Sequence, residues 1–148
     1  MKRNLLIFVA VLLPLLAGLA DKKPLTIEEL KAQAEAATGA HKPLLYVEVV
    51  QREIEHANQF FIAGDVEKAQ STVQEAVLYA EKARGAALKH PHKMKETEIR
   101  LRKAEHRLND IRRTLALEDQ SDVQAAVDAI AALRKQILEA MFAPQDKK

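Results

Sequence analysis

Residues 43–88 read PLLYVEVVQREIEHANQFFIAGDVEKAQSTVQEAVLYAEKARGAAL, and this stretch predicts a long helical hairpin. In its first half, apolar side chains recur at alternating spacings of three and four residues, which places them on one face of a helix. They are Val47, Val50, Ile54, Ala57 and Phe61. Gly64 can adopt the left-handed conformation that closes a helix, and Asp65 suits the N-cap of the next one. We therefore expect two helical arms joined at Gly64-Asp65.

Alanine dominates the apolar face of the second arm. The alanines at the three-four spacing are Ala69, Ala76, Ala80, Ala83 and Ala87. Small residues let two helix axes approach to the short end of the roughly 8–10 Å range. Because each alanine buries little apolar area, larger side chains elsewhere must supply most of the burial energy.

The residues around the turn resemble one tetratricopeptide repeat. In that repeat, small and aromatic residues on the first helix precede a Gly-Asp turn and two alanines on the second. The matching positions are Ala57, Phe60, Gly64-Asp65, Ala69 and Ala76, within residues 50–83. The chain departs from the repeat at Glu53 and His56, where large apolar residues are expected, and Glu81 replaces the closing proline. The resemblance implies a TPR-like hairpin inside a larger bundle, because one repeat cannot bury its face without neighbours.

Residues 1–20 predict a secretory signal peptide. Lys2 and Arg3 precede an apolar run from Leu5 to Ala20 that ends in small residues. This run has about 16 residues, whereas a transmembrane helix needs about 20, so an uncleaved membrane anchor is the lesser alternative. We expect a periplasmic or secreted protein with no stable membrane span after cleavage.

The composition after the predicted signal peptide restricts the possible functions. Residues 21–148 contain 21 basic and 21 acidic residues, so they carry no overall basic field that would recruit nucleic acid. The chain has no cysteine, which excludes disulfides, thiolate metal ligands and thiol catalysis. Glycine, proline and aromatic residues are few, and this composition favours helices over sheets.

A short helix is expected before the hairpin, within the segment 21–42. Thr26 and Glu29 form a capping box for a helix of about Pro24 to Thr38, and Gly39 ends it. Its apolar face is thin. We therefore expect this helix to dock loosely or to lie apart from the main core.

Two long helices are expected after the hairpin. The first runs from about Lys93 to Leu117, begins after Pro91 and keeps a three-four apolar spacing over three heptads. Ser121 and Gln124 form a second capping box, which is expected to begin a last helix. The helices predict an all-α fold, an antiparallel up-down-up-down four-helix bundle over residues 43–143 with a short extra N-terminal helix, followed by a polar tail, 144–148.

The sequence contains no arrangement typical of an enzyme active site. It has no nucleophile near a base, no glycine-rich phosphate loop and no HExxH motif. We therefore expect a protein that is not an enzyme and carries no cofactor: an exported helical interaction module for protein binding, scaffolding or a chaperone-like role. Its partner would be another protein or a second copy of the chain.

Candidate partner-binding residues lie on the long helix and on the hairpin. Arg100, Lys103 and Arg107 share one helix face, which could contact phosphate, lipid A or an acidic partner. Phe60 and Tyr79 are the aromatic candidates. Interleaved acidic residues such as Glu96, Glu98, Glu105 and Asp110 indicate, alternatively, an ordinary solvated helix face. Aromatic residues do not alternate with the basic ones, which argues against nucleic acid.

The alternative function is a metal- or haem-binding sensor or carrier. Helical bundles can hold di-iron through Glu-x-x-His motifs, and Glu53-x-x-His56 occurs once here. His106 is expected at a similar depth in the bundle, so Glu53, His56 and His106 are the candidate metal ligands. However, His106 should point away from the apolar seam, and a second Glu-x-x-His is missing. A structural His56 and a solvated His106 are therefore the competing interpretation.

Overall fold

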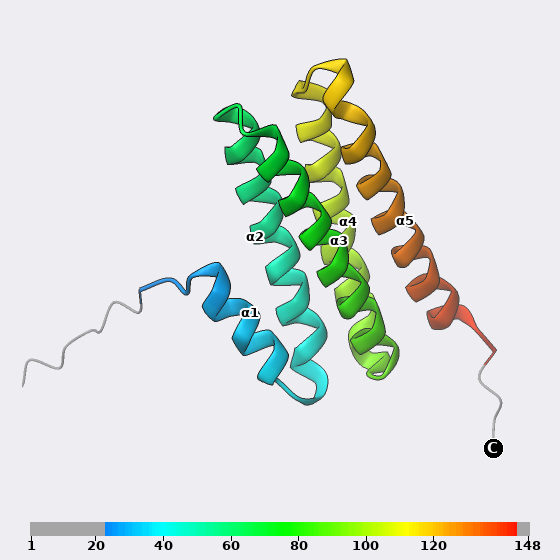
Figure 1. The fold of residues 1–148 in the computed structure, drawn as a ribbon. Coiled ribbons are helices and arrows are strands. Elements are labelled where there is room, and N and C mark those ends of the chain that lie inside the picture. Colours follow the sequence, from blue (N-terminus) through cyan, green and yellow to red (C-terminus); the bar gives the residue numbers. More distant parts are fainter. Residues whose placement is uncertain (1–22, 145–148) are drawn as a thin grey trace, which may run out of the picture.

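The structure is a computed structural model, and it describes residues 23–144. The predicted signal peptide and most of the polar tail lie outside the described residues. The described chain forms five α-helices that pack together, so the fold is all-α as predicted (Figure 1). They are α1 (Ile27–Ala36), α2 (Lys42–Ile62), α3 (Val66–Leu88), α4 (Pro91–Thr114) and α5 (Gln120–Phe142), with short 3-10 turns at Gly39–His41 and Leu117–Asp119. Among the helices of the described chain, none combines the length and hydrophobicity needed to cross a membrane.

The predicted hairpin is confirmed in α2 and α3. Gly64 has a φ of +79°, and the Asp65 N–H donates to the carbonyl oxygen of Phe60 at 2.9 Å, which closes α2. The Asp65 carboxylate then accepts from the backbone N–H of Lys68 at 3.2 Å and caps α3. Gly85 lies within α3 and does not interrupt it.

The predicted apolar faces of the hairpin form its core. On α2, the residues from Val47 to Ala57 that share this face are fully buried, and Phe61 is half-buried at the end of the helix. The five alanines that the spacing placed on the apolar face of α3 are fully buried, whereas Ala86 is half-buried. A single apolar cluster of buried side chains extends from Leu30 in α1 to Ile137 in α5, so all five helices share one core.

The prediction of a second capping box, at Ser121 and Gln124, is wrong. α5 begins at Gln120, not at Ser121, and its N-cap residue, Asp119, makes no side-chain capping bond. The Gln120 side chain instead donates to the carbonyl oxygen of Leu115 at 2.9 Å and accepts from Arg112 at 3.1 Å. These bonds to the preceding helix hold the turn, so the local sequence pattern at Ser121 is not used.

The two hairpins, α2–α3 and α4–α5, lie side by side. α2 contacts α4, α3 contacts α5, and α3 also contacts α4. Each helix of one hairpin therefore packs against its counterpart in the other hairpin (Figure 1).

The expected loose docking of the N-terminal helix is also wrong. α1 packs along α2, and two of its apolar residues, Leu30 and Ala34, are fully buried. Its capping box is confirmed, because the Thr26 hydroxyl accepts from the backbone N–H of Glu29 and the Glu29 carboxylate accepts from that of Thr26. The thin apolar face is sufficient to dock α1 on α2 because polar contacts, described below, add to it.

Candidate functional site

An open groove lies between α2 and α4. It has a volume of about 280 Å³ and is lined by Gln51, Ile54, Glu55, Lys103, Ala104 and Arg107. We refer to it as the α2–α4 groove. Its floor is apolar, because Ile54 and Ala104 are core residues, and its rim is charged. Two of the predicted partner-binding residues, Lys103 and Arg107, thus line one depression.

An ion pair crosses the rim of this groove. Arg107 Nε lies 2.6 Å from Glu55 Oε1, and Arg107 Nη2 lies 2.9 Å from Glu55 Oε2. The hydrogen bonds from Arg107 lower the pKa of the Glu55 carboxyl, and partial burial only partly opposes this effect. Both side chains are about half exposed, at 45% and 50%, so solvent screens the pair and it can rearrange at little cost.

A second depression, the α4 hollow, adjoins the groove along the same helix. It has a volume of about 400 Å³ and is lined by His92, Lys95, Glu96, Ile99, Arg100 and Lys103. Arg100 pairs with Glu96 at 2.8 Å, whereas Lys95 and Lys103 take part in no ion pair within the described residues. Ile99 is 38% exposed and gives the hollow an apolar patch. Since Lys103 lines both depressions, they form one continuous surface.

The charges on this continuous surface are mainly positive. Four of its residues are cationic (Lys95, Arg100, Lys103 and Arg107) and two are anionic (Glu55 and Glu96). It contains no serine, threonine or cysteine that could act as a nucleophile. The arrangement is suited to holding an anionic group beside an apolar one.

The aromatic candidates lie in different environments. Phe60 is half-buried, and Lys68 Nζ lies 4.6 Å from the centre of its ring. Tyr79 is only 7% exposed, and its ring lies 6.0 Å from that of Tyr46, measured between centres. Lys82 Nζ lies 4.7 Å from the Tyr79 ring. The Tyr79 ring is therefore occupied by contacts within the chain.

The three candidate metal ligands do not form a cluster. Glu53 is 4% exposed and pairs with Lys31 Nζ at 2.6 Å, while His56 is half-buried and His106 is exposed. Within residues 23–144, no three histidine, aspartate or glutamate side chains are placed to hold a metal ion. Metal binding by these residues stays a prediction.

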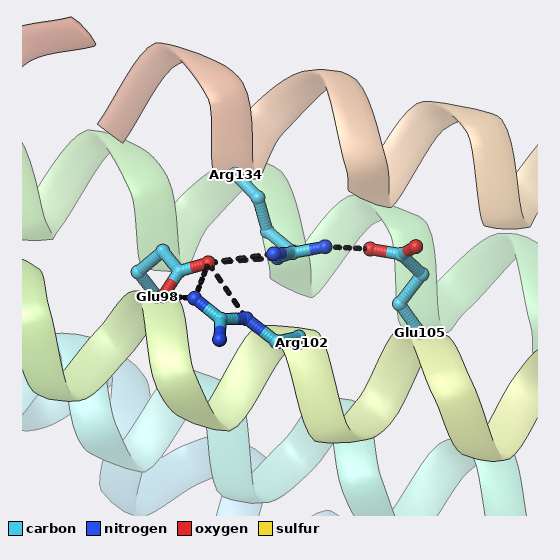
Figure 2. Close-up of polar contacts among 4 residues, drawn as sticks. All are labelled: Glu98, Arg102, Glu105 and Arg134. Atoms are coloured by element: carbon cyan, nitrogen blue, oxygen red, sulfur yellow. Dashed lines mark hydrogen bonds and ion pairs between the residues drawn. The ribbon is translucent and has the colours of Figure 1, made fainter. Parts of the chain in front are cut away.

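A buried charge cluster that sequence reasoning missed joins α4 to α5. Figure 2 shows the Arg134 guanidinium of α5 between two carboxylates of α4, Glu98 and Glu105. Arg134 Nη2 lies 2.7 Å from Glu98 Oε1, and Arg134 also pairs with Glu105. Arg102 approaches Glu98 Oε2 at 2.7 Å. Glu98 is 2% exposed, so its assignment to a solvated face was wrong.

The two arginines of this cluster stabilise the charged form of the Glu98 carboxyl. Burial alone would raise the pKa of the Glu98 carboxyl, but hydrogen bonds from Arg134 and Arg102 outweigh burial and hold that pKa below its usual value. The sequence did contain one signal. Glu98 and Glu105 are seven residues apart and flank the buried seam through Leu101 and Leu108, so they share one side of α4.

Comparison with known proteins yields no relative. No protein-family model, no curated protein and no solved structure matches this chain. The function is therefore argued from the residues and their geometry.

Proposed function

We propose that this protein is a non-catalytic helical interaction module that binds an acidic segment of a partner protein along the α2–α4 groove and the α4 hollow. The observation that carries this proposal is the continuous surface that these depressions form at Lys103, where an apolar floor meets an excess of cationic side chains. Binding surfaces of this kind combine an apolar contact with charges that orient the partner.

Two features favour an acidic partner. Lys95 and Lys103 have no ion-pair partner within the described residues, so a carboxylate of a bound segment can approach them without breaking an existing pair. The half-exposed Arg107–Glu55 pair can rearrange, so that Arg107 would accept a second carboxylate. Ile99 would supply the apolar contact.

We further propose that the four long helices form an up-down-up-down bundle in which α2 and α3 are the single TPR-like hairpin. The contacts of α2 with α4 and of α3 with α5 support this description, because one such hairpin needs neighbouring helices to bury its apolar face. The α2–α4 groove lies between this hairpin and its neighbour.

Export is the remaining part of the proposal, and it rests on residues 1–20. The mass of the protein recovered from the producing cell or its medium tests it. We expect a chain that begins at Asp21, whereas a chain that retains Lys2 and Arg3 would favour the anchored alternative.

Display selection tests the acidic-partner proposal. Random 16-residue peptides would be selected against the purified protein, and the affinity of the selected peptides would then be measured by fluorescence anisotropy. We expect peptides rich in aspartate and glutamate whose affinity falls about tenfold or more in Lys103→Glu, corresponding to about 1.4 kcal/mol. Their affinity should also fall as salt is added.

The matched control is Lys135→Glu. Lys135 is an exposed lysine on α5, and its replacement changes the net charge by the same amount. Equal affinities of Lys103→Glu and Lys135→Glu, or selected peptides without an acidic bias, would contradict the proposal. Binding to vesicles of anionic lipid in place of acidic peptides would contradict it as well.

A further inference from the structure

Polar contacts hold α1 on a surface formed by α2 and α3, which we call the α1 seat (Tyr46, Glu53, Glu75, Tyr79 and Lys82). Lys31 of α1 lies 2.6 Å from Glu53 and 3.5 Å from Glu75, and its Nζ lies 5.5 Å from the centre of the Tyr79 ring. Glu35 of α1 pairs with Lys82 and accepts from the Tyr46 hydroxyl at 3.1 Å. A cation and an anion of α1, four residues apart, therefore meet opposite charges on the seat.

The seat is specific for its occupant because Glu53 is buried. With 4% of its surface exposed, this carboxylate would be a costly unpaired charge if no cation covered it. Burial alone would lower the pKa of Lys31, but Glu53 outweighs this effect and raises it. An occupant must therefore present a cation next to a buried leucine, as Lys31 does next to Leu30.

α1 is short and depends on the seat for its helical structure. It has ten residues, fewer than the roughly 12–15 that an isolated helix needs, so it is helical because it is seated. Only Leu30 and Ala34 in it are fully buried. Five residues, Ala37–His41, connect it to α2, and Gly39 there has a φ of +72°. If α1 leaves the seat, the chain must pivot at this connection.

We propose that the α1 seat also accepts α1 from a second copy of the chain, so that two copies exchange their N-terminal helices and form a dimer. The exchanged helix would make the same contacts as the internal one, and for this reason exchange is a low-cost route to a dimer. The α1 seat shares no residue with the α2–α4 groove or the α4 hollow, so this proposal does not depend on binding of an acidic partner.

Two charge-reversed variants test the exchange. In Lys31→Glu, two acidic side chains face each other when α1 occupies the seat of its own chain. In Glu53→Lys, two lysines face each other there. When the two variants are mixed, each seat finds a matching α1 only on the other chain. We expect native mass spectrometry to show a one-to-one heterodimer in the mixture, with a dissociation constant about tenfold lower than that of either variant's own dimer. A mixture that stays monomeric would overturn the proposal.

The double variant Lys31→Glu/Glu53→Lys is the control, because it restores the pair within one chain. It should behave like the wild type, which shows that the reversed pair can form. If lysine at position 53 prevents folding, the more exposed Glu35–Lys82 pair is used for the test instead. The variants Glu35→Lys and Lys82→Glu are then mixed in the same way. A folded pair of these variants without heterodimer would equally overturn the exchange.

Discussion

At the scale of single residues, the Glu98 carboxylate lies at the contact between α4 and α5. It is buried, and Arg134 from the opposite helix supplies its main partner across the interface. A buried ion pair adds little net stability by itself, but removing one member leaves the other charge uncompensated. We therefore expect the pair to act chiefly as a positional constraint on the second hairpin.

Removing the cation should be costly. We expect Arg134→Met to lower the free energy of unfolding by about 3 kcal/mol, because Glu98 then keeps only the half-exposed Arg102. Urea unfolding followed by circular dichroism measures the change. Lys135→Met, at the neighbouring exposed position, should change stability by less than about 0.5 kcal/mol. Similar losses in both variants would mean that the buried pair is not the cause.

The same carboxylate makes stability depend on pH. Its pKa is lowered in the folded protein, so its contribution is fully present above the unfolded-state pKa of about 4.3 and is lost as pH falls through the folded pKa. We expect the stability difference between the wild type and Glu98→Gln to be largest near neutral pH and to shrink in acid. Urea midpoints at a series of pH values check this, and curves that stay parallel would contradict it.

At the scale of helices and turns, Gly64 adopts the backbone conformation that reverses the chain between α2 and α3. Its φ of +79° is one that alanine adopts only with strain, although a methyl group there would meet no other atom within 4 Å. Gly64→Ala should therefore lower the free energy of unfolding by about 1 kcal/mol through the backbone alone.

Gly85 is the matched control for that change. It lies inside α3, also with nothing within 4 Å of an added methyl group, and its φ is not positive. Gly85→Ala should raise the free energy of unfolding by about 0.5–1 kcal/mol, because alanine is the better helix former. Thermal unfolding of both variants measures the two shifts. Shifts of the same sign would contradict the assignment of Gly64 to a turn.

Local signals explain which elements could be predicted from the sequence. The Thr26 capping box and the Gly64-Asp65 turn involve residues within five positions of one another, and both are confirmed. The docking of α1 depends on Lys31 meeting Glu53, 22 positions away, and no spacing rule contains that contact. The prediction at Ser121 failed for a different reason. Gln120 bonds to Leu115 and Arg112, five and eight positions earlier, and α5 begins one residue before Ser121.

At the scale of the whole molecule, one core connects both hairpins and α1. Leu108 of α4 is fully buried within it. We expect Leu108→Ala to lower the free energy of unfolding by about 2–5 kcal/mol. The tyrosine signal of Tyr46 and Tyr79, which report on the first hairpin, should shift by the same amount as the total helical signal.

Leu117 is the control for this core substitution, because its side chain is 87% exposed. Leu117→Ala should change stability by less than about 0.5 kcal/mol. Circular dichroism in the near and far ultraviolet follows the two signals. A tyrosine transition that does not move in Leu108→Ala would show that the hairpins unfold independently.

Periodicity predicts which face of a helix is buried but not which helix covers it. The seam through Leu101 and Leu108 is buried as expected, and the basic face with Arg100, Lys103 and Arg107 was also recognised. The groove beside that face exists because α2 lies next to α4, a contact between distant segments. For this reason the sequence indicates the charged residues of the candidate site but not the depressions that they line.

The short turn at Gly64-Asp65 also has a consequence for the rate of folding. Only three residues, 63–65, separate α2 from α3, so the chain closes a very small loop before these helices meet. Contacts between segments near in sequence require little loop-closure entropy, and proteins rich in them fold within microseconds to milliseconds. The first hairpin can therefore form early, before it packs against the second.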